Sequence, residues 1–256
     1  MGAETESSDR QRRLPLWVAT LSWEEVARRQ PGAAGAILPV GAACKEHGYH
    51  LPLNTDFLQA EWFAAKAARR FGLLVWPTLS YGYYPAFIDY PGSISLSRAT
   101  FVAAAQEVIE GILRAGVARV FVLNTGVSTI APLQEAVAAS VCPNAVLLIN
   151  IYQGSHYLSS VAELEEQAFG GHADEIETSI MLAIAPREVS LSRAIGSSKP
   201  IAAGVLNRSH PDGANYSPSG ATGEPRLAST QKGEIIVEAI LADLEQGINQ
   251  ALEGNA

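Results

Sequence analysis

Residues 36–56 decide the fold: the chain runs Ala36-Ile37-Leu38-Pro39-Val40 and then, after four further residues, Lys45-Glu46-His47-Gly48-Tyr49-His50-Leu51-Pro52-Leu53-Asn54-Thr55-Asp56. The first run is short and apolar, which predicts a buried strand. From residue 55 to residue 70, apolar side chains recur at three- and four-residue steps, which predicts a helix capped by Asn54 or Thr55. A strand, a polar loop and a helix in succession are typical of a βαβ unit.

The same alternation continues along the chain. Strands are expected over 73–79, 120–123 and 145–151, and helices over 98–114, 132–140, 173–185 and 232–252. Strands separated by helices predict an α/β fold, a three-layer αβα sandwich with a mainly parallel sheet. Because ligands bind beyond the carboxyl ends of parallel strands, the loops after the first three strands should carry the chemistry.

Composition narrows the class of protein. The 256 residues suffice for one large α/β domain, which we expect over 14–256. Residues 1–13 lack the apolar core of a signal peptide, so we expect a flexible, cytoplasmic segment there. A net charge of -8 argues against a nucleic-acid surface, and no apolar run approaches the roughly 18 residues that span a bilayer. Two cysteines form no disulfide framework and are expected to be reduced.

The loop after the first strand is the first candidate site. It holds two of the five histidines, His47 and His50, close to Glu46 and Asp56. Histidine and carboxylate side chains crowded at a strand end are what a zinc, manganese or iron site needs. Two simpler interpretations stay open. Asp56 can stabilise the dipole of the helix that it begins, and Lys45 can form a solvated ion pair with Glu46.

The second candidate site is the segment Gly171–Ser179. Glu177 shares a helix face with apolar residues, so its carboxylate needs a buried partner, for which a metal is one candidate. Asp174 and Glu175 are explained by helix-dipole compensation. His172, just before the helix, is either a cap-region residue or a proton carrier.

The third candidate is the turn Asn124-Thr125-Gly126-Val127-Ser128-Thr129 after the third strand. Backbone N–H groups of a small-residue turn that opens a helix can hold an anion, but no phosphate-loop lysine and no G-x-S-x-G motif accompanies it. Tyr81 and Tyr83 are candidates for a pocket wall, although Tyr/Gly-rich surface turns are equally common.

Four segments, taken in order, resemble the creatininase (creatinine amidohydrolase) family: Pro39-Val40-Gly41 with His47-Gly48-Tyr49-His50-Leu51-Pro52-Leu53 and Thr55-Asp56; Tyr81-Gly82-Tyr83 with Tyr90-Pro91-Gly92-Ser93; His172-Ala173-Asp174-Glu175-Ile176-Glu177-Thr178-Ser179; and Gly223-Glu224-Pro225 with 228–233. The resemblance implies a three-layer α/β fold, a divalent and often binuclear metal centre, hydrolysis of amide-type C–N bonds and, often, hexamers. It also implies that His47 and Asp56 are metal ligands, with Asp56 bridging.

Two departures from the family pattern alter the expected site. The family's glutamate ligand stands two residues before the histidine, where this chain has Lys45, and its glutamate is Glu46. The family's third-strand motif N-G-H-G-G-N contains a ligating histidine, and the turn from Asn124 to Thr129 has none. Three alternatives follow from the lost ligand: the site holds one metal in place of two, a residue such as His50 or His210 replaces the ligand, or no metal binds. Creatinine is then disfavoured as the substrate.

The resemblance and the residues together predict a cytoplasmic, metal-dependent hydrolase of a small, cyclic, polar molecule, cleaving an amide-type C–N bond with one or two divalent ions (Zn, Mn or Fe). The predicted metal ligands are Glu46, His47, Asp56 and Glu177, the catalytic groups His172 and Glu177, and the substrate contacts His50, Tyr81, Tyr83, Ser128 and Thr129. We expect a homo-oligomer that binds neither nucleic acid nor membrane. The alternatives are C–C ring opening of a cyclic polyol-ketone and a metal-free, degenerate binding protein.

Overall fold

Five parallel strands form the sheet in the computed structural model, which describes residues 16–197, 199–202 and 204–254. They are β1 (Leu16–Trp17), β2 (Ala36–Val40), β3 (Leu74–Val75), β4 (Val120–Asn124) and β5 (Val146–Asn150), in the spatial order β1-β3-β2-β4-β5. All five residues of β2 pair in register with β4, from Ala36 opposite Val120 to Val40 opposite Asn124. The loops after β2 and β4 therefore leave the same edge of the sheet side by side.

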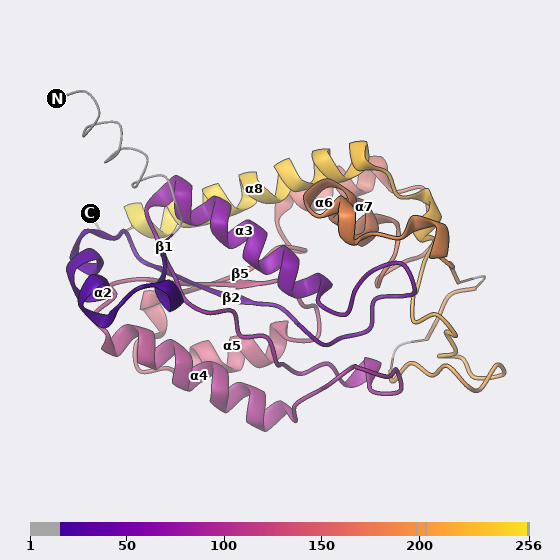
Figure 1. Ribbon diagram of the computed structural model, residues 1–256, viewed down its shortest axis with the longest axis horizontal. Helices are drawn as coiled ribbons and strands as arrows, with labels where there is room; N and C mark the ends of the chain where they lie inside the picture. The colour runs from indigo at the N-terminus through magenta and orange to yellow at the C-terminus, as the bar shows by residue number, and fades with distance from the viewer. Residues whose placement is uncertain (1–15, 198, 203, 255–256) are drawn as a thin grey trace.

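Helices cover both faces of this sheet, as Figure 1 shows. On one side lie α3 (Thr55–Phe71), α6 (Ser155–Leu164), α7 (Glu175–Ile184) and α8 (Thr230–Glu253), and on the other α4 (Arg98–Arg114) and α5 (Ile130–Ala139). Helix α2 (Trp23–Arg29) lies near the β1 end of the sheet. Short 3-10 helices occur at Val18–Thr20, Gln30–Gly32, Pro85–Phe87, Pro143–Ala145, Pro186–Glu188, Leu191–Arg193 and Pro225–Leu227.

Alternate side chains of each central strand enter opposite layers of the core. Ile37 and Phe121 pack with α3, α7 and α8, whereas Leu38 and Val122 pack with α4 and α5. Full burial of each such side chain contributes about 1.5–3 kcal/mol. A strand buried on both faces must be apolar throughout, and this explains why β2 is a continuous apolar run.

The predicted α/β sandwich with a parallel sheet is confirmed, but some elements differ from expectation. The strand expected over 73–79 is only Leu74–Val75, because Pro77 has no N–H to donate, and pairing resumes at Leu79 beside Val40. The helix expected from residue 173 begins at Glu175, since Asp174 caps it by accepting hydrogen bonds from the N–H groups of Ile176 and Glu177.

Elements β1, α2 and α6 were not predicted. For α2 a signal exists, because Ser22 and Glu25 form a capping box. The expected flexible segment 1–13 and its boundary lie outside the described residues. Among the helices of the described residues, none combines the length and the apolar character needed to cross a membrane.

Candidate metal centre

The loop after β2 and the start of α7 meet beyond the carboxyl edge of the sheet. The loop brings His47, the first turn of α3 brings Asp56, and the segment leading into α7 brings His172 and Glu177. The rings of His47 and His172 have centroids 5.0 Å apart. Gly41 permits the first turn of α3 to lie against the end of β2, because a Cβ at residue 41 would lie 2.3 Å from the carbonyl oxygen of Asp56.

The ring of His47 is fixed by hydrogen bonds at both nitrogens. Its Nδ1 lies 2.9 Å from the carbonyl oxygen of Lys45, which can only accept, so Nδ1 carries the hydrogen. Its Nε2 lies 2.9 Å from Asp56 Oδ1 and 3.6 Å from Glu177 Oε1. A lone pair that faces two carboxylates needs a cation between them, either a proton or a metal ion. Ligating histidines are usually held in this way, with the far nitrogen on a carbonyl.

His172 is oriented in the same manner by Glu46. Its Nε2 lies 2.9 Å from the carbonyl oxygen and 3.2 Å from Oε2 of Glu46, which leaves Nδ1 facing Glu177 Oε2 at 3.7 Å. Burial by itself lowers the pKa of His172, but the Glu46 charge and hydrogen bond outweigh it, so the pKa is raised above its ordinary value.

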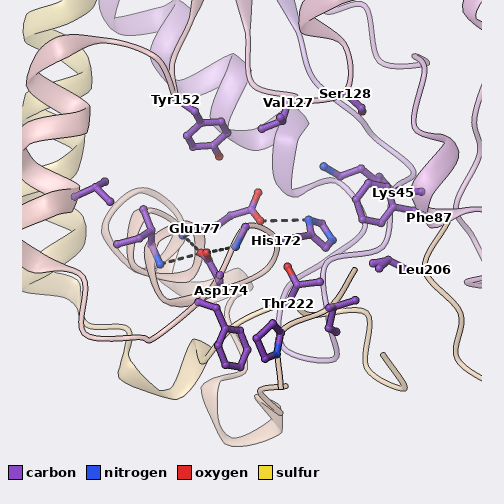
Figure 2. A pocket seen from close by; sticks show the side chains of 18 of the residues that line it. Lys45, Phe87, Val127, Ser128, Tyr152, His172, Asp174, Glu177, Leu206 and Thr222 are labelled. Carbon is purple, nitrogen blue, oxygen red and sulfur yellow. Dashed lines mark hydrogen bonds and ion pairs between the residues drawn. The ribbon is translucent and has the colours of Figure 1, made fainter. Parts of the chain in front are cut away.

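Glu177 completes a group of three potential ligands. The ligand atoms of His47, His172 and Glu177 all lie within 4.8 Å of one another. Two donors about 2.1 Å from a tetrahedral ion are roughly 3.4 Å apart, close to the observed nitrogen–oxygen separations. The N–H of Ala173, whose φ of 47° turns the chain sharply, donates to Glu177 Oε2 at 2.7 Å. Figure 2 shows the Glu177 carboxylate beside the His172 ring. These residues fit a divalent ion.

Asp56 lies next to this group and is paired with Lys45. Lys45 Nζ is 2.7 Å from Asp56 Oδ2, and both side chains are buried. Burial raises the pKa of Asp56, but the charges of Lys45 and His47 outweigh it and hold the pKa below its usual range. The interpretation of Lys45 as a solvated partner of Glu46 is wrong, because the buried aspartate attracts the ammonium inward.

Glu46 enters the site but faces away from the three ligand atoms. Its Oε1 accepts a hydrogen bond from the N–H of Gly48, and its Oε2 faces His172. Burial raises its pKa, and His172 more than offsets this, so the pKa is lowered. Of the four predicted metal ligands, the structure thus groups His47 and Glu177 with His172, holds Asp56 Oδ1 against His47 Nε2, and turns Glu46 toward the far nitrogen of His172.

A cavity of about 800 Å³ opens above the group. His172, Asp174, Glu177 and Lys45 line it together with apolar and aromatic side chains, among them Phe87, Tyr152, Tyr157, Phe169 and Leu206 (Figure 2). Sequence reasoning missed Tyr152. Its position just after the end of β5 could have indicated it, because ligands bind beyond the carboxyl ends of parallel strands.

The predicted substrate contacts are mostly elsewhere. Ser128 lines the cavity, and its hydroxyl donates to the carbonyl oxygen of Tyr83. The other four do not line it: Tyr81 is exposed, Tyr83 packs against the core under α4, and the hydroxyl of the buried Thr129 bonds to Asn124 Oδ1. His50 bonds to Thr178 through Nε2, and burial lowers its pKa to about 4.

The αβα sandwich, with a histidine–carboxylate group at the carboxyl edge of its sheet, places this chain among α/β proteins that have a candidate metal site. The family model described as Creatininase: Creatinine amidohydrolase matches residues 19–248, and the chain belongs to the creatininase family. It is a hydrolase of that family.

Known relatives and solved structures agree with this assignment. The chain is 28% identical to creatinine amidohydrolase of Pseudomonas putida, over 92% of this chain and 96% of the relative. It is 25% identical to 3-dehydro-scyllo-inosose hydrolase of Thermotoga maritima, over 93% and 84%. A manganese form and a Zn-Zn form of creatininase match with TM-scores of 0.78 and 0.77, both at 27% identity over 94% of this chain and 98% of theirs. These forms and the histidine–glutamate group support a divalent metal.

Proposed function

We propose that this chain is a metal-dependent hydrolase that cleaves an amide-type C–N bond of a small, cyclic, polar molecule. One observation carries the proposal: His47 Nε2 and His172 Nδ1 both direct a lone pair toward Glu177, beneath a cavity of about 800 Å³. Two nitrogens and one carboxylate with an open side are the ligand set of many catalytic zinc sites.

In this proposal His47, His172 and Glu177 hold a single divalent ion. A bound ion would supply Lewis acidity and make water a stronger acid. Glu46 positions the His172 ring, as carboxylates behind ligating histidines commonly do.

The proton of the attacking water needs an acceptor at the cavity. Asp174 lines the cavity, but its oxygens already accept hydrogen bonds from the N–H groups of Gly171, Ile176 and Glu177. Glu177 lines it as well, and among the described residues only its Oε2 accepts a hydrogen bond, from the N–H of Ala173, so Glu177 Oε1 is the group best placed to take that proton.

The test is metal content together with turnover. Purified protein is analysed for bound metals and assayed on a panel of small cyclic amides, alongside His47→Ala and a control, His156→Ala, at an exposed histidine that pairs with Asp243. We expect His47→Ala to lose metal and turnover together, whereas the control keeps both. Protein that binds no divalent ion, and that added Zn or Mn does not stabilise, would contradict the proposal.

The same test decides the role of His172. As a ligand, His172 makes metal binding sensitive to the His172→Gln substitution, and affinity should fall about 10–100-fold or more. A variant that keeps full metal affinity and loses only turnover would make His172 the proton carrier.

A second candidate function is C–C ring opening of a cyclic polyol-ketone. It is favoured by the similarity to 3-dehydro-scyllo-inosose hydrolase and by Gly126, which stands where the family motif has its histidine. Adding cyclic polyol-ketones to the substrate panel separates the two: an acid without a released amine identifies C–C cleavage.

A further inference from the structure

We propose that the ammonium of Lys45 is a built-in cation of this site. It takes the role of a second metal ion and donates a hydrogen bond to the oxygen that gains negative charge during hydrolysis. The inference rests on the proposed function and deepens it, since it fixes the number of ions at one and names the group that replaces the other.

The position of Lys45 is the first support. Its Nζ lies 2.7 Å from Asp56 Oδ2, while Asp56 Oδ1 lies 2.9 Å from His47 Nε2. The ammonium therefore contacts the aspartate that the family resemblance assigns as the bridging ligand. It also lies 5.1 Å from the ring centroid of Phe87 and 5.7 Å from that of Tyr84, a setting that favours a cation.

The donors that a second ion would need are replaced. Lys45 stands two residues before His47, at the family's glutamate position, and an ammonium cannot ligate a metal. Gly126 stands at the third position of the family's third-strand motif, where the histidine belongs. A side chain there would be crowded, because a Cβ would lie 2.7 Å from Thr129 Oγ1.

The charges balance with one ion. Glu46, Asp56 and Glu177 are the buried carboxylates that contact His47 or His172, and together they carry three negative charges. Lys45 supplies one positive charge and a single divalent ion supplies two, so this contacting group is neutral, while the nearby Asp174 carboxylate is held by backbone N–H groups at the start of α7. A second divalent ion would add two further positive charges to the buried group, and unpaired buried charge is strongly unfavourable.

Lys45 is also placed to act on a substrate. It lines the cavity, and its ammonium forms an ion pair with Asp56 Oδ2. Among the described residues no other oxygen accepts a hydrogen bond from Nζ, so the ammonium can also donate to a ligand oxygen. When water adds to the carbonyl carbon, the C=O π electrons move to oxygen, which accepts a hydrogen bond from Nζ. The C=O bond then re-forms, the C–N bond breaks, and the nitrogen takes the proton given up by the water.

The experiment combines metal counting with calorimetry and kinetics on the full chain. Wild-type protein loaded with excess Zn, then desalted, is expected to hold about one ion per chain. Lys45→Met removes a positive charge from the site, so Zn should bind at least about 10-fold more tightly while kcat falls about 10²–10³-fold. The matched control is Lys66→Met on the exposed face of α3, where the Lys66 ammonium lies 4.7 Å from the ring centroid of Trp62. It makes the same change in net charge and should alter neither value.

The outcomes separate the inference from the proposed function. Two ions per wild-type chain would overturn the inference and leave the function standing, and this count needs no variant to fold. Unchanged affinity and kcat in a folded Lys45→Met would also overturn it. No bound ion would overturn both proposals. Lys45→Arg, which keeps the charge, should stay at one ion with affinity within a few fold of wild type.

Discussion

The loops that follow β2 and β4 leave adjacent strands at the same edge of the sheet, yet one carries charged side chains and the other neutral ones. The loop after β2 and the turn into α3 hold three buried side chains together: Asp56 forms an ion pair with Lys45 and a hydrogen bond with His47. In the turn after β4, by contrast, neutral side chains bond to one another: Asn124 Oδ1 accepts from the N–H of Gly126 and the hydroxyl of Thr129. A strand-end position thus permits chemistry, and only the side chains decide whether it occurs.

The two loops are nevertheless coupled. The hydroxyl of Thr125, in the turn after β4, lies 2.9 Å from the carbonyl oxygen of Asp56 and 3.1 Å from that of Val40. The turn after β4 therefore braces the backbone that carries Asp56. In this account the first loop supplies charge and the second supplies rigidity.

The largest effect should come from the charged side of the site. Glu177→Gln removes a proposed ligand and proton acceptor, so kcat should fall by about 10³-fold. Steady-state kinetics and zinc titration measure this, with Glu234→Gln at an exposed position of α8 as the control. Retention of full turnover in Glu177→Gln would remove Glu177 from the mechanism.

Asp56→Asn should destabilise the fold by about 3–5 kcal/mol, because it leaves the Lys45 ammonium buried without a counter-charge. Urea unfolding at pH 7 in the presence of a chelator measures the change without a metal contribution. The double variant Asp56→Asn with Lys45→Met should recover part of the loss. A loss in the double variant as large as the sum of the two single ones would show that the pair is not coupled.

Stability should depend on pH through His50. Its pKa is about 4 in the folded chain, because burial disfavours the charged ring, against about 6.5 when unfolded. The unfolded chain therefore binds the proton first as the pH falls, and stability is lost between pH 6.5 and pH 4, by about 3 kcal/mol at most. The His50→Gln variant should lack this pH-dependent component. The difference between the free energies of unfolding of wild type and variant should therefore change between pH 6.5 and pH 4. A constant difference across that range would contradict the role of His50.

The smallest effect should come from the turn after β4. Thr129→Val deletes the hydroxyl that bonds to Asn124 Oδ1 and to the carbonyl oxygen of Gly126, at a cost of about 1–2 kcal/mol. Metal content and kcat should stay near wild type, which thermal unfolding and zinc analysis can check. A large loss of turnover would give this turn a chemical role and break the contrast between the loops.

Sequence reasoning located the main elements of the fold because their patterns are local. The apolar run of β2 and the periodic helix from Arg98 to Arg114 match the structure at both ends. The strand expected over 73–79 was overestimated, because pairing in β3 ends at Val75. Helix α6 was missed because none of its residues is fully buried and no side chain caps its start at Gly154.

The candidate site was only partly predictable, because it is assembled from loops whose paths depend on long-range contacts. Sequence alone singled out His47, His172 and Glu177. It did not indicate that Lys45 turns inward, because the partner that draws it in, Asp56, reaches it only after the loop closes. Nor did it show that Glu46 faces His172, since this requires α7 and the loop after β2 to meet.

Anomalous diffraction at the zinc edge, from crystals of the zinc-loaded wild-type protein, would show how many ions the site holds and where. We expect one peak per chain, among His47 Nε2, His172 Nδ1 and the Glu177 carboxylate, with the Lys45 ammonium still beside Asp56. A second peak next to Asp56, or no peak at all beside His47, would contradict this account.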